Sequence, residues 1–255
     1  MTTRRVELEG PLNFRDLGGY VVADSGHRVR WGRLYRSDSL HHLTPADGPR
    51  LAELGIRTAV DFRANDELDR LGIGPVGDLS IRHVHCPTTD RIREAAVRDW
   101  AEARSAADVY LSMIEFGGPA YAEALRTVAD ADALPAVFFC VAGKDRTGCF
   151  AAMVLGLLGV SDEDVVADYA LTQEVVAEII ARRVPLTEEE EEAAREQYGH
   201  LPQDLREAQA ASMESLLVRM RERWGDWEGY VDALGIGPDI IAGLRTALLE
   251  PDAPG

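Results

Sequence analysis

Short apolar runs alternate with helix-like segments along most of the chain. Residues 56–62 have the pattern of a buried strand, residues 80–86 that of another, and residues 135–139 are apolar throughout, as in a central strand covered on both faces. Residues 106–131 show helical spacing and break at the Gly-Gly-Pro of 117–119, which predicts two helices. Helices alternating with strands predict an α/β fold, with a central, mostly parallel sheet flanked by helices.

Turn and capping residues mark further elements. The segment NFRDLGGY (13–20) has two glycines before a Tyr-Val-Val strand, which predicts a tight turn that enters a sheet. Thr44 is suited to cap a helix of about three turns that ends at Gly55. The segment 146–159 is apolar nearly all round and predicts a buried helix. Ser161 is suited to cap the next helix. The apolar face of that helix comprises Val165, Tyr169, Thr172, Val176 and Ile180.

The composition allows one large hydrophobic core, and one segment differs in composition from the rest of the chain. With 255 residues, 46% of them hydrophobic, the chain is expected to form a single domain over residues 1–255. From about Pro185 the sequence becomes strongly acidic and then amphipathic. Residues 185–225 are therefore predicted to be a helical insertion, either a lid or a plain pair of surface helices with solvated glutamates.

The formal charge of −17 limits the kinds of partner that the chain can bind. Nucleic-acid binding depends largely on cationic contacts to phosphates, so no nucleic-acid partner is expected. A small phosphorylated ligand stays compatible with this charge, because a few amides and one or two cations set the field inside a cleft.

The sequence predicts a cytoplasmic protein with reduced thiols. No apolar run approaches the roughly 20 residues that cross a bilayer, and the N-terminal segment lacks the apolar core of a signal peptide, although export without a leader stays open. Cys86, Cys140 and Cys149 form neither an even disulfide framework nor paired metal knuckles. We expect no transmembrane segment, no metal and no organic cofactor.

A cysteine and an arginine, with five residues between them, lie where a buried strand meets a buried helix: Cys140 and Arg146. A loop at this junction can point its backbone N–H groups inward, and the positive end of the helix adds to their field, so the loop is suited to bind a phosphate dianion. The same field favours thiolate over thiol at Cys140. The planar fork of Arg146 matches two phosphoryl oxygens, and Thr147 is suited to donate a hydrogen bond to the sulfur. The predicted phosphate-binding residues are Val141, Ala142, Gly143, Lys144, Asp145 and Arg146.

The competing interpretation of Cys140 is a small hydrophobic residue of the core. It leaves unexplained why Lys144, Asp145 and Arg146 crowd between an apolar strand and an apolar helix, where unpaired charges are costly. A nucleotide-binding loop is also excluded, because that motif requires Ser or Thr after its lysine and this chain has Asp145. We therefore interpret Cys140 as a nucleophile.

The motifs of the chain resemble one family. The segments NFRDLGGY, LYRSDSL, AVDFR, CVAGKDRTG, VVADYALT and GYVDALGI are similar to those of bacterial tyrosine, dual-specificity and lipid phosphatases of the mycobacterial protein tyrosine phosphatase B type. The resemblance implies a protein-tyrosine-phosphatase-like fold and a metal-free mechanism through a phosphocysteine intermediate. It implies hydrolysis of phosphotyrosine, with phosphoserine, phosphothreonine or phosphoinositides as further substrates. It also implies that the acidic helical pair after Pro185 covers the active site.

Two residues compete for the role of general acid, which must protonate the leaving oxygen. The resemblance points to Asp90, in the loop after the strand at 80–86, and Asp145 in the cysteine loop is the second candidate. Relatives usually have histidine before the nucleophile, whereas this chain has Phe139. That departure motivates a non-enzymatic rival, a pseudophosphatase that binds phosphorylated ligands. The enzymatic rival is a rhodanese-like sulfurtransferase, which also holds a cysteine in an anion-binding loop.

Overall fold

A five-stranded sheet forms the centre of the protein, which we describe from a computed structural model. The pairings β4–β7, β7–β5 and β5–β6 are parallel, and the edge strand β1 runs antiparallel to β4. The predicted mostly parallel sheet is therefore confirmed. Its strands, in spatial order, are β1 (Arg15–Asp16), β4 (Leu34–Ser37), β7 (Ala136–Phe139), β5 (Thr58–Asp61) and β6 (Arg82–His85). The structure describes residues 4–23, 25–90, 103–182, 192 and 202–252.

The side chains of β7 alternate between two hydrophobic cores, one on each face of the sheet. Phe138 packs edge-on against Phe150 in the larger core, with 4.9 Å between ring centroids. Phe139 belongs to the smaller core together with Tyr35. A strand buried on both faces must be apolar at every position, which explains the run at 135–139 and its place in the middle of the sheet.

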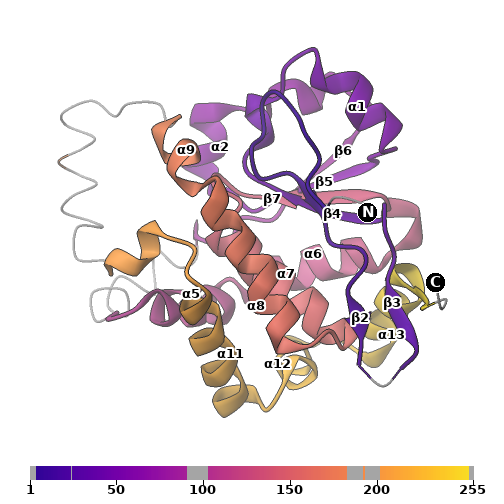
Figure 1. Ribbon diagram of the computed structural model, residues 1–255, viewed down its shortest axis with the longest axis vertical. Coiled ribbons are helices and arrows are strands. Elements are labelled where there is room, and N and C mark those ends of the chain that lie inside the picture. The colour runs from indigo at the N-terminus through magenta and orange to yellow at the C-terminus, as the bar shows by residue number, and fades with distance from the viewer. Residues whose placement is uncertain (1–3, 24, 91–102, 183–191, 193–201, 253–255) are drawn as a thin grey trace.

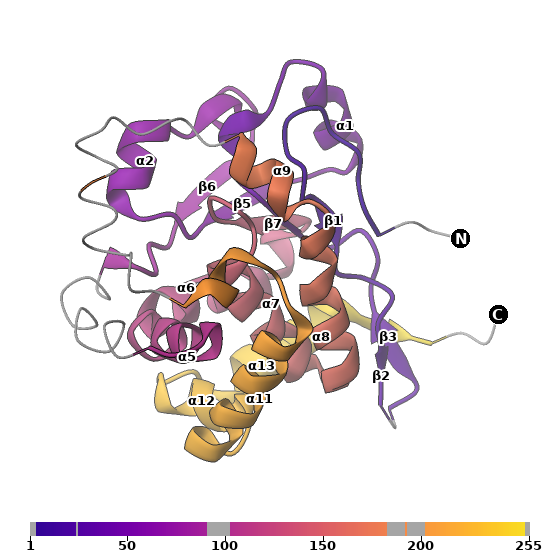
Figure 2. The ribbon, with the colours of Figure 1, turned by 60° about the vertical axis from the view of Figure 1, so that its left-hand side comes forward.

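Helices cover both faces of the sheet unequally (Figures 1 and 2). Helix α1 (Asp47–Glu53) lies on the side of the smaller core. On the other side, α7 (Asp145–Leu158) is buried along most of its length, because α5, α8, α12 and α13 all pack against it. The remaining helices of this thick layer are α5 (Ala106–Phe116), α6 (Gly118–Ala129), α8 (Asp162–Ala170), α11 (Ala210–Trp224), α12 (Trp227–Ala233) and α13 (Pro238–Leu248).

Several expected boundaries are confirmed. The Gly-Gly-Pro segment separates α5 from α6, and the Ser161 hydroxyl accepts a hydrogen bond from the N–H of Asp164 at 3.2 Å, as a helix cap does. Gly159 ends α7 in the left-handed conformation, with φ of 87°. A small second sheet was not expected from the sequence. It joins β2 (Val21–Val22), β3 (His27–Val29) and the C-terminal β8 (Leu249–Pro251).

Two boundary predictions were wrong. Helix α1 begins at Asp47, not after Thr44, because the buried Asp47 carboxylate accepts hydrogen bonds from the N–H groups of Thr44 and Glu9 at 2.9 and 2.6 Å. The predicted helix from Ser161 to Ile180 is divided into α8, a 3₁₀ turn (Leu171–Glu174) and α9 (Val176–Ala181). The helix is interrupted where Thr172 makes a tertiary contact, because the Thr172 hydroxyl accepts a hydrogen bond from Arg15 at 3.2 Å.

The C-terminal part of the predicted insertion belongs to the core. Helix α11 buries Met213, Leu216, Leu217 and Met220 in the larger core and packs against α5 and α8. Residues 183–191 and 193–201 lie outside the described part of the chain, so the lid stays a prediction. None of the described helices is long and apolar enough to cross a membrane.

Gly156 allows α7 and α12 to approach closely, which leads to a stability prediction. A Cβ atom at this position would lie 2.1 Å from Cδ1 of the buried Trp227 ring. Alanine would gain about 1 kcal/mol of helix propensity, but overpacking costs about 1–3 kcal/mol. The difference is a net loss of about 0–2 kcal/mol, so we expect Gly156→Ala to lower the free energy of unfolding by about 1 kcal/mol, measured by urea denaturation. Gly48→Ala in α1, where the nearest atom is 4.0 Å away, is the matched control and should not destabilise.

Candidate active site

The loop between β7 and α7 carries the predicted nucleophile. Cys140 follows the last residue of the strand and is 2% exposed, and α7 begins at Asp145. Gly143 has φ of 63°, and a Cβ atom there would lie 2.4 Å from the carbonyl oxygen of Ser37. The tight turn therefore requires glycine at this position. The positive end of a 14-residue helix points at the loop, which is the arrangement that favours anions.

Cys140 opens into a cavity of about 240 Å³. The loop contributes Cys140, Val141, Ala142, Asp145 and Arg146 to its lining, so the structure brings five of the predicted site residues together. The walls come from three other elements. They are the 3₁₀ turn Leu40–His42, helix α2 (Asn65–Leu71), and α9 with the residue that follows it, and they contribute His41, His42, Glu67, Arg70, Leu71, Ile179 and Arg182.

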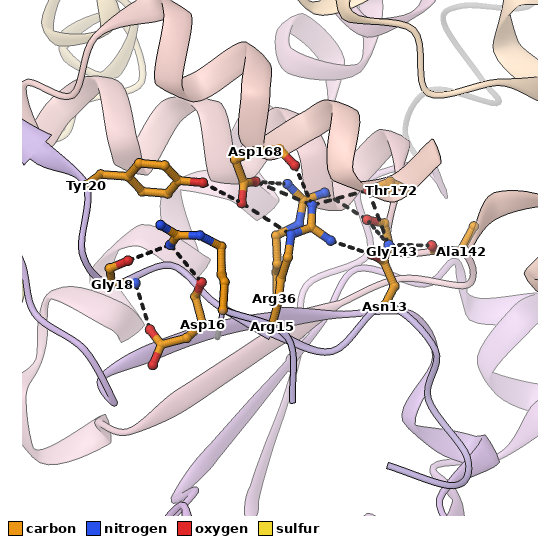
Figure 3. Close-up of polar contacts among 11 residues, drawn as sticks. Asn13, Arg15, Asp16, Gly18, Tyr20, Arg36, Ala142, Gly143, Asp168 and Thr172 are labelled. Atoms are coloured by element: carbon orange, nitrogen blue, oxygen red, sulfur yellow. Dashed lines mark hydrogen bonds and ion pairs between the residues drawn. The ribbon is translucent and has the colours of Figure 1, made fainter. Parts of the chain in front are cut away.

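A buried ion network lies beneath the loop (Figure 3). The Asp168 carboxylate of α8 pairs with Arg36 of β4 at 2.5 Å and with Arg15 of β1 at 3.2 Å. Arg36 also donates a hydrogen bond to the Gly143 carbonyl at 2.8 Å. The amide of Asn13 donates to the same carbonyl at 3.2 Å. Two strands and one helix are thereby joined to the turn of the active-site loop.

The network fixes the charge state of its members. Burial alone would raise the pKa of Asp168, but the two guanidinium groups of Arg15 and Arg36 outweigh it and lower this pKa to about 2. Burial lowers the pKa of Arg36 to about 10, with Arg15 adding to the effect and Asp168 opposing it. At neutral pH the cluster therefore holds one carboxylate between two cations.

Arg146 is held by Glu67 of α2, a residue that had not been identified from the sequence. The Glu67 carboxylate binds both terminal nitrogens of the guanidinium, at 3.1 Å for Nη2 and in a shorter contact with Nη1. The Nε–H of Arg146 takes no part in this pair, so the guanidinium keeps donors for a bound phosphate. Burial would lower the pKa of Arg146, but the charge of a Cys140 thiolate, and then that of Glu67, raise it overall.

Asp145 is oriented by a tyrosine pair. The Tyr110 hydroxyl donates a hydrogen bond to Oδ1 of Asp145 at 2.6 Å and lies 2.6 Å from the Tyr169 hydroxyl. Burial, and then the charge of Asp145, hold the pKa of Tyr110 well above its usual value, so this hydroxyl remains a donor. Lys144 contacts the same Oδ1 at 3.1 Å. Among the described residues Oδ2 of Asp145 has no hydrogen-bond partner.

Lys144, one of the predicted phosphate-binding residues, is not among the described residues that line the cavity. It is 3% exposed and donates hydrogen bonds to the carbonyl oxygens of Leu205 and Glu207, the latter at 3.0 Å. These carbonyls lie at the 3₁₀ turn Gln203–Arg206 that precedes α11. The ammonium group thus ties the active-site loop to this turn, and only the backbone of Lys144 is left for a phosphate.

The remaining predicted residues have distinct surroundings. Asp90 accepts a hydrogen bond from the N–H of Asn65 at 3.2 Å, at the start of α2, and it is not among the described residues that line the cavity. The Thr147 hydroxyl is buried and has no hydrogen-bond partner in the described part of the chain, the Cys140 sulfur included. Phe139 lies under Arg63, whose guanidinium carbon is 5.4 Å from the ring centroid.

A sequence profile described as "Tyrosine phosphatase family" matches residues 6–250. The chain belongs to this family. The phosphatase is 28% identical to the triple specificity protein phosphatase PtpB of Mycobacterium tuberculosis, over 95% of this chain and 98% of that one. It is 34% identical to a protein of Cupriavidus necator whose name assigns it provisionally to the tyrosine-protein phosphatases, over 62% of this chain. The aligned part spans only 59% of the Cupriavidus protein.

Solved structures give a weaker likeness. The phosphatase is similar to TpbA of P. aeruginosa in complex with phosphotyrosine, with a TM-score of 0.30, 21% identity and coverage of 60% of this chain and 76% of that one. It is also similar to the core catalytic domain of the PP-IP phosphatase SIW14 of S. cerevisiae, with a TM-score of 0.38, 16% identity and coverage of 77% and 99%. Overlap at this level supports no inference about the site.

The pairing of Glu67 with the Arg146 guanidinium gives a test. We expect Glu67→Gln to lower kcat/KM for an aryl phosphate about tenfold, because the loss of a charge-assisted pair costs about 1.5–3 kcal/mol and frees the guanidinium to rotate. Glu115→Gln in α5, which breaks a surface pair with Arg223, is the matched control. A rise in kcat/KM would contradict this role, because it would mean that repulsion between Glu67 and the substrate outweighs the positioning.

Tyr110 should matter only where the leaving group needs a proton. We expect Tyr110→Phe to lower kcat/KM, which covers the steps up to departure of the leaving group, about tenfold for phenyl phosphate, since a hydrogen bond to a charged group contributes about 1.5–3 kcal/mol. The loss should be smaller for dinitrophenyl phosphate, whose leaving group departs without protonation. Tyr230→Phe, which removes a buried hydroxyl bonded to the Ile114 carbonyl, is the control. Equal losses for both substrates would indicate a purely structural role for Tyr110.

Proposed function

We propose that the chain hydrolyses phosphate monoesters, with phosphotyrosine as one substrate and phosphoserine, phosphothreonine or phosphoinositides as others. The observation that carries this proposal is the meeting of Cys140, Arg146 and Asp145 on the floor of one cavity, at the positive end of α7. This arrangement supplies a nucleophile, a clamp for two phosphoryl oxygens and a proton donor.

In the first proposed step, the Cys140 sulfur attacks phosphorus. A sulfur–phosphorus bond forms, the bond from phosphorus to the leaving oxygen breaks, and Asp145 gives that oxygen a proton. Asp145 is favoured over Asp90 because it lines the cavity, whereas Asp90 contacts the start of α2. In the second step, water attacks phosphorus, Asp145 takes its proton and the thiolate leaves. The Thr147 hydroxyl, which has no partner among the described residues, is suited to stabilise the leaving sulfur.

The surroundings of Phe139 bear on the pseudophosphatase alternative. Its ring lies in the smaller core, on the face of β7 opposite to Phe138, and its neighbour Arg63 is held by Asp61 at 2.6 Å. The loop contacts described above come from Arg36 and Asn13, and neither depends on a histidine at position 139. We infer that the loop keeps its anion-binding form with phenylalanine at this position, and we therefore favour the enzyme.

We infer a reducing, cytoplasmic location from the thiols. Cys86, Cys140 and Cys149 are all free and buried. A nucleophilic thiol requires a compartment in which it stays reduced. Phosphorylated proteins and phosphoinositides are the partners proposed for this location, and no nucleic acid is among them.

Replacement of the nucleophile tests the proposal. We expect Cys140→Ser to abolish turnover of phenyl phosphate, since a hydroxyl is far less ionised than a thiol, while phosphate binding stays measurable by calorimetry because the amides and Arg146 remain. Cys86→Ser, which also replaces a buried thiol, is the matched control and should retain turnover. Turnover by Cys140→Ser at the wild-type rate would remove Cys140 from the mechanism. Absence of turnover in the wild type would favour the pseudophosphatase.

A further inference from the structure

A second cavity, of about 110 Å³, is separate from the active-site cavity. It lies between the N-terminal segment that leads into β1 and the 3₁₀ turn that follows α8. Its apolar lining comprises Leu12, Phe14, Leu171 and Val175, and Leu171 is 37% exposed. None of the described residues that line it also lines the active-site cavity. Since an apolar cavity of about 150 Å³ encloses a benzene ring, this one is of a size that holds a small organic molecule.

The charged residues around the second cavity are mainly basic. Arg4, Arg5 and Arg15 line it, together with one acidic residue, Glu174. Backbone carbonyl oxygens bind the Arg4 guanidinium. The exposed side chains of Arg5 and Glu174 form no ion pair or hydrogen bond with any described residue. The guanidinium of Arg5 is therefore available to an anionic ligand.

The buried ion network contributes a further positive charge to this cavity. Asp168 supplies one negative charge to Arg15 and Arg36, so one positive charge is in excess. Arg15 is 3% exposed and is the member of the network that lines the second cavity. Its Nη1 carries two N–H groups and donates one of them to Oδ1 of Asn13, its one partner among the described residues (Figure 3). A carboxylate at this position would bind the second N–H and balance the excess charge.

The second cavity is connected to the active-site loop by direct contacts. Asn13 lines the cavity, and its amide donates hydrogen bonds to the carbonyl oxygens of Ala142 and Gly143 at 3.3 and 3.2 Å. Leu12 and Val175 also line it and belong to a small apolar cluster with Ala142. Ala142 in turn lines the active-site cavity. A ligand in the second cavity therefore contacts residues that hold the loop in place.

We propose that the second cavity binds a small carboxylate with an apolar body, and that this ligand weakens the binding of phosphate at the Cys140 loop. The apolar body packs against Leu12 and Leu171, and the carboxylate binds Arg5 and Arg15. A monoanion suits this site better than a phosphate dianion, because the apolar lining penalises the loss of hydration. The two ligands oppose each other because both are anions held beside the same loop. Binding of the carboxylate is independent of the proposed phosphatase function, and its effect on turnover rests on that function.

Calorimetry with benzoate tests the site. We expect the wild type to bind benzoate with a Kd of about 1 mM or below, and to bind benzamide, which has the same shape but no charge, at least about tenfold more weakly. Absence of benzoate binding by the wild type would refute the site. Equal affinity for the two compounds would refute the role of the arginines.

Two exposed lining residues assign the binding to this cavity. We expect Arg5→Met to raise the Kd of benzoate about tenfold, because one charge-assisted contact is lost. Leu171→Ser should raise it about threefold through the loss of an apolar contact. Arg126→Met, which removes an exposed arginine of α6 outside both cavities, is the matched control and should leave the Kd as in the wild type. An unchanged Kd in both Arg5→Met and Leu171→Ser would mean that benzoate binds elsewhere, and would refute the assignment.

The form of the inhibition distinguishes this site from competition at Cys140. We expect benzoate to lower kcat/KM for phenyl phosphate to a plateau about fivefold below its starting value, because coupling between two sites saturates. Arg5→Met should require about tenfold more benzoate to reach half of this effect. Inhibition that proceeds towards zero without a plateau would indicate binding in the active-site cavity and would refute the coupling.

The reciprocal measurement does not depend on turnover. Inorganic phosphate should raise the Kd of benzoate by the same factor of about five, since coupling between two binding sites is symmetric. Benzoate binding that Arg5→Met weakens but that inorganic phosphate leaves unchanged would refute the antagonism. If the wild type fails to turn over phenyl phosphate, the proposed function is refuted, and calorimetry still decides whether the second site exists.

Discussion

A single buried carboxylate, that of Asp168, holds the base of the active-site loop together. It lies between Arg15 and Arg36, and Arg36 also donates a hydrogen bond to the carbonyl oxygen of Gly143. Two guanidinium groups in an apolar interior are tolerable only with such a partner, since an uncompensated buried charge is strongly destabilising. The pairing of the Asp168 carboxylate with these two arginines fixes β1, β4 and α8 relative to the loop (Figure 3).

The same constraint governs the charged residues within the loop, each of which finds a partner from a different element. Glu67 of α2 pairs with Arg146, and Tyr110 of α5 donates a hydrogen bond to Asp145. Backbone carbonyls before α11 accept hydrogen bonds from Lys144. The Lys-Asp-Arg run is thereby compatible with its position between an apolar strand and an apolar helix. Each of these partners also orients the charged group that it binds, so stability and positioning have one physical origin here.

The active-site cavity differs in charge from the protein as a whole. The chain carries a net charge of −17, yet the wall beside Cys140 is lined by two arginines and two histidines. A low-dielectric cleft responds to the nearest charges far more than to distant solvated ones. An acidic surface is therefore compatible with a site that attracts phosphate, and the exposed glutamates have little influence on it.

The sequence by itself determined the order of elements and the chemistry of the loop, because apolar periodicity, turn residues and the spacing of Cys140 and Arg146 are local properties. It placed residues 135–139 in the middle of the sheet and divided α5 from α6. It did not identify Glu67 or Tyr110, and it gave Lys144 no internal partner. Such contacts join residues far apart in the chain, as Lys144 and Glu207 are, and no local pattern records which distant partner a buried charge will meet. Only the tertiary structure decided these contacts, because each buried charge must bind a polar or charged group on whichever element packs beside it.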